Sequence, residues 1–566
     1  MHVAQMDETH DFVVVGSGGG SMCAGLVMRK AGKSVLVLEK TDLLGGSTAK
    51  AGGVMWIPAN RFMAEAGIKD SVEEAETYLN AVVEAQDGGA QWGEAPGTSR
   101  ERRRTYIVEA NRMLDFLIGQ GIRFARNPWW PDYYSSRPGG NAPGRTVSAD
   151  LFDINELGEW KHKLRPNAFQ MAAPIADALL LPLIKVSWKA RFKAAKVVLR
   201  GALAKLTGKH IVTAGAALQG RMLQAAVREG VELRTHSPVR RVIQDDSGAV
   251  IGVETEKEGK PWRVGARLGV LLNAGGFARN QDMRDRYIPH TRCEWSHTAP
   301  GDTGDMHREM MRIGAWMGQM EELVGNQMTL PPGYPESAGV QPQITKPHSF
   351  LVDQTGTRYM NEGGSYMEFC QRQLARHKVA PAVPSWWIVD QRFMSTYMIA
   401  GTMPGSKKPE EWFTSGYMKR ADSIEELAEA CGIPPEALKA TTERFNGFAR
   451  SGVDEDFGRG DSAYDQFLGD FTHGPNASLG TVEQAPFYAV QVVPGDVGTF
   501  GGVVTDCEAR VLREDGTPIP GLYATGTTTA AVMGRTYPGA GCSIGPSFTW
   551  GFVAAKHAAG LGNAGV

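Results

Sequence analysis

Asp11-Phe-Val-Val-Val-Gly-Ser-Gly-Gly-Gly20 is a short apolar run that ends in a glycine cluster. A helical pattern follows over residues 21–32, and a second apolar run, Ser34-Val-Leu-Val-Leu38, ends in Glu39. Strand, glycine turn, helix, strand and acid in this order are typical of a dinucleotide-binding β-α-β unit. The glycines let the backbone approach a pyrophosphate, and the acid accepts hydrogen bonds from ribose hydroxyls. The residues expected at the cofactor are Gly16, Ser17, Gly18, Gly19, Gly20 and Glu39.

The segment after this acid, Glu39-Lys-Thr-Asp-Leu-Leu-Gly-Gly-Ser-Thr48, continues directly into a second glycine turn. It resembles the segment that crosses the pyrophosphate and reaches the isoalloxazine in flavoproteins of the fumarate reductase and succinate dehydrogenase type. Members that bind FAD covalently carry a histidine near this point, where this chain has Ser47 and Thr48. The resemblance therefore implies non-covalent FAD, with contacts from Lys40, Gly46, Ser47, Thr48, Gly52 and Gly53.

Three later pieces fit the same resemblance: Ser237-Pro-Val-Arg-Arg-Val242, Leu271-Leu-Asn-Ala-Gly-Gly-Phe277 and Pro520-Gly-Leu-Tyr-Ala-Thr-Gly526. In such proteins the first passes near the adenine, and the other two bring a glycine turn against the diphosphate or ribityl chain. Near the C-terminus a helix is expected to begin with its positive end toward the pyrimidine edge of the flavin. These pieces add Val239, Ala274, Gly275, Gly526, Ser543 and Ile544 to the expected cofactor site.

The glycine-rich pieces divide the chain. They lie in residues 11–53, 237–323 and 488–566, whereas residues 324–487 lack such turns. At 566 residues the chain is too long for one hydrophobic core. We therefore predict an α/β protein with a Rossmann-like FAD-binding domain formed by residues 1–323 and 488–566. An α+β substrate-capping catalytic domain, residues 324–487, is inserted into it.

Composition excludes several function classes. A net charge of -2 gives no electrostatic basis for nucleic-acid binding. The 6 cysteines form no C-x-x-C, and the 12 histidines show no ligand spacing, so neither a disulfide framework nor a metal site is expected. The early first strand leaves no room for a signal peptide, and no apolar stretch reaches the roughly 20 residues of a spanning helix. We expect a cytoplasmic enzyme with reduced thiols.

Residues 174–209 differ in composition from the rest. From Lys185 to Lys209 there is no acid, and Lys or Arg stands at positions 185, 189, 191, 193, 196, 200, 205 and 209. Steps of four and three place the following apolar residues on one helical face: Ile184, Trp188, Phe192, Ala195, Leu199, Ala202 and Leu206. Basic amphipathic helices of this kind are typical of proteins that bind an anionic membrane surface. We expect peripheral attachment to the inner face of the cell membrane; packing on its own domain or another subunit is the alternative.

Another glycine-rich stretch, Gly534-Arg-Thr-Tyr-Pro-Gly-Ala-Gly-Cys-Ser-Ile-Gly545, is a candidate for chemistry. The Tyr537 phenol and the Gly541 N–H are two donors that could hold a ketone oxygen and stabilise the charge that develops on enolisation. This stretch also matches the G-x-S-x-G hydrolase motif. That motif requires a preceding strand, whereas Tyr-Pro-Gly-Ala precedes it here, so a serine nucleophile is not expected.

Two further loops complete the pattern. Together, Asp132-Tyr-Tyr134, Ser365-Tyr-Met-Glu-Phe369 and Tyr537-Pro-Gly-Ala-Gly541 resemble the active-site loops of 3-ketosteroid Δ1-dehydrogenases. The resemblance implies that Tyr537 and the Gly541 N–H hold the oxygen at carbon 3. It also implies that Tyr366 removes a proton from carbon 2 with help from Tyr133, while flavin N5 takes a hydride from carbon 1.

The implied partners are a 3-ketosteroid and a quinone or other electron acceptor, and an oligomer is possible. Dehydrogenation at the 4,5 bond and a fumarate-reductase-like enone reductase are the alternatives within flavoenzymes. A non-catalytic electron-transfer or membrane-docking flavoprotein is the alternative outside them. From their proximity to the motifs, Trp129, Trp130 and Phe500 are expected near the pocket wall.

Overall fold

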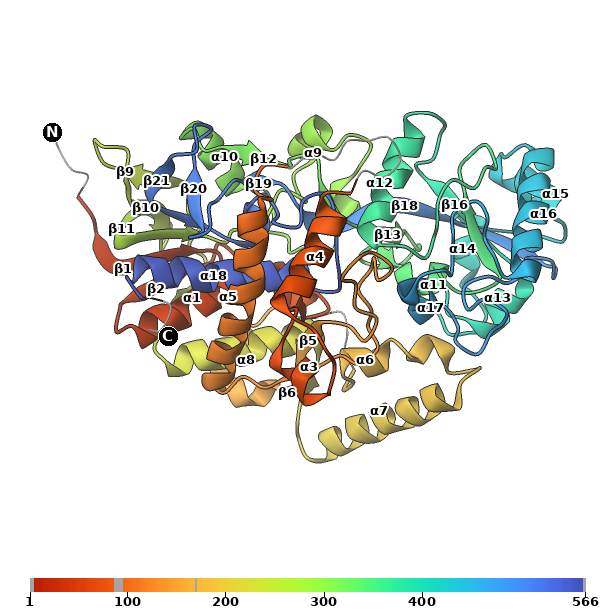
Figure 1. Cartoon of the computed structure of the whole chain (residues 1–566), viewed down its shortest axis with the longest axis horizontal. Helices are drawn as coiled ribbons and strands as arrows, with labels where there is room; N and C mark the ends of the chain where they lie inside the picture. Colours follow the sequence, from red (N-terminus) through yellow and green to blue (C-terminus); the bar gives the residue numbers. More distant parts are fainter. Residues whose placement is uncertain (1–4, 86–94, 168–170, 563–566) are drawn as a thin grey trace.

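The computed structural model describes residues 5–85, 95–167 and 171–562. It has two lobes, each built on its own sheet (Figure 1). In the first, β1 (Glu8–Val15) lies between β2 (Val35–Leu38) and β11 (Lys260–Leu272) and runs parallel to both. This eight-stranded sheet follows the order β20-β21-β11-β1-β2-β8. Its other strands are β8 (Glu232–Arg234), β9 (Arg241–Gln244), β10 (Val250–Lys257), β20 (Arg510–Leu512) and β21 (Pro518–Ala524).

Helices α1 (Gly19–Lys30) and α18 (Ile544–Ala558) pack closely together beside this sheet. A Cβ on Gly19 would lie 1.9 Å from the Phe548 ring, and one on Gly20 would lie 2.3 Å from the Ser547 carbonyl oxygen. The glycines at the start of α1 are therefore required for helix packing. Helices α5 (Arg100–Gly119) and α8 (Ala214–Arg228) complete this side of the lobe.

The second lobe is formed around a six-stranded sheet. Its strands are β13 (Leu323–Thr329), β14 (Ala338–Gly339), β15 (Ser349–Val352), β16 (Ser385–Val389), β17 (Met418–Ala421) and β18 (Phe487–Thr499). Because β18 pairs with β13, β16 and β17, the chain stays in this sheet until Thr499. The predicted return to the FAD domain at residue 488 therefore comes too early. The covering helices include α12 (Tyr366–His377), α15 (Ile424–Cys431) and α16 (Pro435–Ser451).

A small sheet of β3 (Val54–Trp56), β5 (Thr146–Ala149) and β4 (Phe124–Arg126) holds the loop that carries Tyr133. Beneath this loop the guanidinium of Arg145 pairs with Asp70 at 2.6 Å and with Asp132 at 2.5 Å, and all three side chains are buried. The Trp56 indole N–H also donates to Asp132, at 2.7 Å. Paired buried charges of this kind fix a loop, because breaking either contact leaves an uncompensated charge.

The basic segment 174–209 forms α6 (Ile175–Ala178), the 3-10 turn η2 (Leu181–Leu183) and α7 (Trp188–Leu206), so the predicted helix is confirmed. It is partly built into the protein, because Leu183 and Ala190 lie in the core of the second lobe. Figure 1 shows α7 running along the outside of the molecule. Large apolar side chains of α7 are exposed, with Trp188 at 80%, Phe192 at 71% and Leu206 at 83%. Among the described helices none is both long and apolar enough to cross a membrane.

The remaining elements connect these parts. The helices and 3-10 turns are α2 (Gly46–Lys50), α3 (Arg61–Glu65), α4 (Val72–Val83), η1 (Ile154–His162), α9 (Gln281–Tyr287), η3 (Cys293–Trp295), α10 (Asp305–Arg312), α11 (Gln341–Ile344), α13 (Gln391–Thr396), α14 (Glu410–Thr414), α17 (Ala463–Leu468) and η4 (Gly526–Thr528). The strands are β6 (Phe152–Asp153), β7 (Ile211–Val212), β12 (Met317–Gly318) and β19 (Gly502–Val503).

Candidate active site

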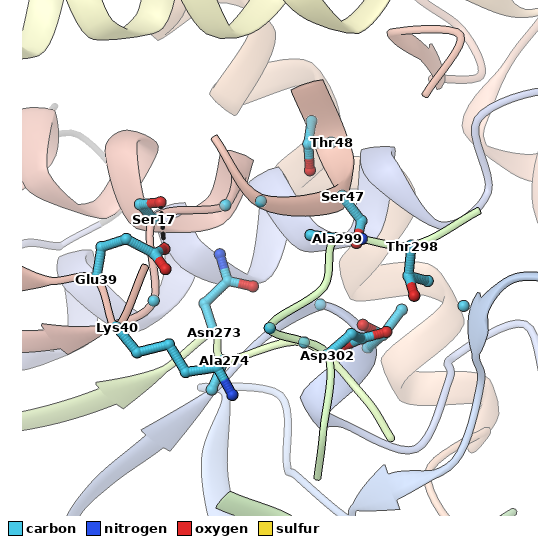
Figure 2. Close-up of a pocket in the computed structure, with 18 of the residues that line it drawn as sticks. Ser17, Glu39, Lys40, Ser47, Thr48, Asn273, Ala274, Thr298, Ala299 and Asp302 are labelled. Atoms are coloured by element: carbon cyan, nitrogen blue, oxygen red, sulfur yellow. Dashed lines mark hydrogen bonds between the residues drawn. The ribbon is translucent and has the colours of Figure 1, made fainter. Parts of the chain in front are cut away.

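A cavity that opens to solvent begins where β1 and β2 end. Figure 2 shows side chains from several segments around it. The expected cofactor residues that line it are Gly16, Ser17, Gly18, Glu39, Lys40, Gly46, Ser47, Thr48, Val239, Ala274, Gly275, Gly526, Ser543 and Ile544. Segments hundreds of residues apart in sequence thus meet at one site.

Four expected residues, Gly19, Gly20, Gly52 and Gly53, are not among the cavity lining. The first two pack α1 against α18, as described above. Gly53 has a φ of +64°, and a Cβ there would lie 2.2 Å from the Ala214 carbonyl carbon. Gly53 shapes the turn before β3, where its close neighbour is protein backbone. A glycine in the sequence can predict a close backbone contact, but it does not tell whether the neighbour is protein or cofactor.

The glycine turn and the acid have the geometry that a dinucleotide requires. A Cβ on Gly16 would lie 2.2 Å from the Asn273 carbonyl oxygen, and its φ is +95°, so only glycine fits. One carboxylate oxygen of Glu39 accepts from Ser17 Oγ at 2.6 Å. The other accepts from the Thr41 N–H and hydroxyl at 2.9 and 2.8 Å. The carboxylate is held at the cavity wall with capacity left to accept from ribose hydroxyls.

Other lining residues were not on the predicted list, among them Arg165, Asn273, Thr298, Ala299 and Asp302. Asn273 lies within a glycine piece, and Asp302 lies in Gly301-Asp-Thr-Gly-Asp305 ahead of α10, so sequence signals for both existed. Arg165 comes from an irregular loop without any motif. Burial raises the pKa of Asp302 to about 6, the largest effect, while the hydrogen bond from the Gly276 N–H lowers it.

The fit to FAD can be judged from this lining. The lining combines a glycine turn, the N-terminal ends of α1 and α18, and an acid at the ribose position. Both lobes contribute to it, since Val497 and Gly498 belong to β18. The described lining contains no histidine or cysteine. These residues fit a bound flavin dinucleotide.

The three predicted tyrosines meet in one cluster. The ring centroids of Tyr366 and Tyr537 are 4.8 Å apart, those of Tyr133 and Tyr366 are 5.5 Å apart, and those of Tyr133 and Tyr537 are 5.9 Å apart. The Tyr133 N–H donates to the Pro538 carbonyl at 2.8 Å, which ties two of the loops together. The cluster adjoins the cofactor cavity, because Ser543 lines that cavity and bonds to the Tyr537 hydroxyl at 3.0 Å.

Tyr537 and Gly541 are arranged as donors. The Tyr537 oxygen accepts from the Ser543 N–H at 3.2 Å and lies 3.0 Å from the Ser543 hydroxyl oxygen, with either hydroxyl able to donate to the other. Burial raises the pKa of Tyr537 to about 12, so it stays protonated at neutral pH. Gly541 has a φ of +99°, and a Cβ there would lie 2.5 Å from the Val54 carbonyl oxygen. Within the described residues the Gly541 N–H has no hydrogen-bond acceptor.

Tyr366 is the first residue of α12. Its expected role as a base requires surroundings that favour the phenolate, but its surroundings favour the neutral phenol. Burial raises the pKa of Tyr366 well above its usual value, and charge repulsion from neighbouring phenols adds to this shift. A base at neutral pH needs neighbours that favour the phenolate. The hydroxyl interaction between Tyr366 and Tyr133 lowers the pKa of Tyr133, and the hydrogen bond with Tyr537 raises the pKa of Tyr366 further.

Comparison with known proteins identifies the family of this chain. The model of the FAD binding domain family matches residues 11–544. The 3-oxosteroid 1-dehydrogenase of Mycolicibacterium smegmatis is 37% identical, with 97% of each chain covered. The 3-ketosteroid Δ1-dehydrogenase of Sterolibacterium denitrificans, solved with 1,4-androstadiene-3,17-dione, superposes with a TM-score of 0.91 at 34% identity, covering 98% of this chain and 100% of that one.

This chain belongs to the 3-ketosteroid Δ1-dehydrogenase family of FAD-binding proteins. It is a flavin oxidoreductase, and the predicted α/β fold with FAD as cofactor is confirmed. A further relative, the 4-oxocyclohexanecarboxylate 2-dehydrogenase of Sinomonas cyclohexanicum, is 34% identical over 98% of this chain and 93% of its own.

In this member of the 3-ketosteroid Δ1-dehydrogenase family, a fourth tyrosine that the sequence did not predict joins the cluster. Tyr464 of α17 stacks on Tyr133, with ring centroids 4.1 Å apart and planes at 26°. No motif marks it, because α17 reaches the site only through the fold of the second lobe. Of the expected wall residues, Phe500 lies 6.0 Å from the Tyr537 ring, whereas Trp129 is 71% exposed and Trp130 stacks on Phe467.

Proposed function

We propose that this protein catalyses FAD-dependent 1,2-dehydrogenation of 3-ketosteroids. The observation that carries the proposal is the tyrosine cluster in which Tyr537, a donor, and Tyr366, a tyrosine that can accept a proton, have ring centroids 4.8 Å apart. Gly541, whose N–H is the second donor, follows Tyr537 in the same loop. This cluster adjoins the end of the cavity that fits the flavin ring. No such pair of donors is needed in a non-catalytic flavoprotein.

The residues act as follows in this proposal. The Tyr537 hydroxyl and the Gly541 N–H hold the oxygen at carbon 3 and stabilise the negative charge that develops there, which is worth roughly 3 kcal/mol for one such donor. Tyr366, as phenolate, removes a proton from carbon 2, and Tyr133 stabilises that phenolate. FAD supplies the acceptor for the hydride at carbon 1. Loss of one proton and one hydride leaves the 1,2 double bond.

Non-covalent attachment of FAD is part of the proposal. It is supported by the absence of histidine and cysteine from the described cavity lining, since neither side chain is there to form a bond to the flavin. Acid precipitation is expected to release all the yellow colour into the supernatant. Colour retained in the pellet would show a covalent link.

The reaction is tested by mixing the oxidised protein anaerobically with androst-4-ene-3,17-dione and following the flavin absorbance. We expect bleaching and a 1,2-unsaturated product. Bleaching with a saturated ketosteroid and a 4,5-unsaturated product would move the assignment to the 4,5 bond. Reoxidation of dithionite-reduced flavin by an enone alone would indicate a reductase. 4-Oxocyclohexanecarboxylate serves as the comparison substrate, because a relative is named for it.

Membrane attachment through α7 is proposed on the exposure of its aromatic and aliphatic side chains on a helix rich in lysine and arginine, of which Lys193 pairs with Asp177 at 2.7 Å. Steroids partition into lipid, and a quinone there could reoxidise the flavin, so attachment to the cytoplasmic face of the membrane suits the reaction. Deleting 174–209 would not test this, since Leu183 and Ala190 belong to the core.

The sharper test is the double variant Trp188→Gln/Phe192→Gln in co-sedimentation with anionic phospholipid vesicles. Binding is expected to fall while flavin content and flavin reduction persist. The control is Val379→Gln, an equally exposed apolar residue at 80% on the second lobe. Unchanged vesicle binding together with a change in oligomeric state would instead make α7 a subunit contact.

A further inference from the structure

The segments that carry Tyr366 and Tyr537 belong to different lobes, and one buried acid lies between them. Tyr366 begins α12 in the second lobe, whereas Tyr537 precedes α18 of the first lobe. Glu322 lies between β12 and β13, where the chain crosses from the first lobe to the second. Its side chain is only 3% exposed.

Glu322 contacts a different segment through each of its three oxygen atoms. One carboxylate oxygen pairs with the Arg535 guanidinium at 2.6 Å. The other accepts from the Gln371 amide at 2.7 Å. The backbone carbonyl accepts from the Phe500 N–H at 2.8 Å, just after β18 ends and the chain returns toward the first lobe. Glu322 therefore joins both crossings between the lobes to α12 and to the loop that carries Tyr537.

A second contact ties α12 directly to that loop. The Gln371 amide also donates to the Arg535 carbonyl at 2.9 Å. Gln371 follows Tyr366 by five residues in α12, which is about 7.5 Å along a helix axis. Arg535 precedes Tyr537 by two residues. Connections this short limit how far either phenol can move independently of the other.

The contacts of Glu322 depend on one another. A buried carboxylate that loses its cation or its hydrogen-bond donor keeps the cost of desolvation without the compensating contact. Loss of Arg535 or of Gln371 would therefore loosen the whole junction. Small displacements matter for the reaction, because a misplacement of about 1 Å between reacting groups can lower a rate on the order of 10²-fold.

We propose that Glu322 and Gln371 are positioning residues that hold the loop of Tyr537 against α12, so that the ketone-holding donor and the base reach the same substrate. The proposal rests on the proposed function, in which Tyr537 holds the oxygen at carbon 3 and Tyr366 removes a proton from carbon 2. Because these two carbons are bonded to each other, the two phenols must keep a fixed separation, and their ring centroids are 4.8 Å apart.

The test compares Gln371→Met, which keeps the length of the side chain but removes its donor, with Gln373→Met as a matched control. Gln373 lies on the same helix and is fully buried, and its amide donates to the carbonyls of Ala382 and Val492 at 2.9 Å each. Both variants should lose a similar amount of stability, because each leaves two acceptors without a donor. Only Gln371→Met should lose activity.

The measured quantity is the rate of flavin reduction by saturating androst-4-ene-3,17-dione. We expect this rate to fall about ten- to hundredfold in Gln371→Met, with steroid binding, judged by flavin spectral perturbation, little changed. Glu322→Gln should behave in the same way, since a neutral amide keeps the shape but forms no ion pair with Arg535. An equal loss of rate in Gln373→Met would overturn the inference.

A second measurement does not depend on turnover. Hydrogen–deuterium exchange of peptides covering residues 531–541, followed by mass spectrometry, reports how firmly the loop is held. Exchange should be faster in Gln371→Met and Glu322→Gln than in wild type or Gln373→Met. Unchanged reduction rates or unchanged exchange in both variants, with normal flavin content, would overturn the inference. A wild type that androst-4-ene-3,17-dione fails to bleach would overturn the proposed function, and the exchange would still test the anchoring of the loop.

Discussion

At the scale of the residue, this site depends on hydroxyl groups whose protonation is set by burial. Burial raises the pKa of Tyr537 to about 12 and keeps it protonated, although its two contacts with Ser543 act in the opposite direction. Tyr366 is also protonated in the protein alone, although its proposed role requires the phenolate. The same buried environment therefore favours the protonated form that Tyr537 needs as a donor and disfavours the phenolate that Tyr366 needs as a base. The same desolvation strengthens every contact that the substrate oxygen makes with Tyr537 and Gly541.

The rate of flavin reduction by a ketosteroid should consequently rise with pH. Because the pKa of Tyr366 is raised, the phenolate fraction grows about tenfold per pH unit below that pKa. Stopped-flow reduction from pH 6 to pH 10 measures this. Tyr366→Phe should lose roughly 10²–10⁴-fold in rate yet still bind the steroid, as judged by flavin spectral perturbation. A pH-independent rate would contradict the role.

The two oxygen-holding donors differ in how they can be altered. Tyr537→Phe should lower the rate about 10²–10³-fold with little change in structure. Gly541→Ala should cost more, because a Cβ would lie 2.5 Å from the Val54 oxygen and φ is +99°. Anaerobic reduction rates, with flavin content as the check on folding, distinguish the two. Gly432→Ala, at the end of α15 in the second lobe, is the control for strain at a positive φ, because φ is +69° and nothing lies within 4 Å of a Cβ there.

Asp302 predicts a dependence of stability on pH. Its folded-state pKa, about 6, lies above the ordinary value of 3.8, so its stabilising contribution is present below pH 3.8 and is lost as pH rises through 6. The Asp302→Asn variant does not lose stability in this way, because its side chain does not ionise. In the FAD-free protein, the free energy of unfolding of Asp302→Asn minus that of wild type should increase between pH 4 and 7, by up to about 3 kcal/mol. Urea unfolding at several pH values measures it.

At the scale of the element, the residue at which a helix begins depends on the local sequence, whereas the face that the helix buries depends on tertiary packing. Ser423 and the acids after it predict a helix start, and α15 begins at Ile424 with Ser423 accepting from the Glu426 N–H. In α7 the helical period is confirmed, yet the small residues Ala190 and Ala204 face the protein while Trp188 and Phe192 face outward. Hydrophobicity alone would have placed the large residues inside.

Two leucines of the basic segment, one buried and one exposed, test its two halves. Leu183→Ala should lower the free energy of unfolding by about 2–5 kcal/mol, because Leu183 is 2% exposed within the second lobe's core. Leu199→Ala, at 60% exposure, should change it by less than about 0.5 kcal/mol. Denaturant unfolding compares them. An equal loss of stability in the two variants would mean that the exposed face of α7 packs against another surface.

At the scale of the whole molecule, the cofactor cavity joins the two lobes. Its lining takes Gly16 and Gly18 from the first lobe, and Val497 and Gly498 from β18, the central strand of the second. The active-site cluster is shared in the same way, since Tyr133 comes from the small sheet beside the first lobe and Tyr366 and Tyr464 come from the second. Neither lobe holds a complete site.

FAD should accordingly stabilise both lobes together. Free FAD at a hundred times its Kd should raise the free energy of unfolding by about 2.7 kcal/mol. Calorimetry of the FAD-free protein should show a lower Tm, with a broader or divided transition. Restoring FAD should give a single transition, and an FAD-independent Tm would contradict a cavity that spans the lobes.

The sequence by itself determined the cofactor class, the order of the β-α-β unit and the three tyrosine loops, because each depends on local spacing of glycines, apolar runs and hydroxyl groups. Only the tertiary structure decided which glycines line the cavity rather than pack against another helix, how far β18 extends the second lobe, and that Tyr464 reaches Tyr133. These depend on contacts between segments distant in the chain, for which no local pattern of residues carries a signal.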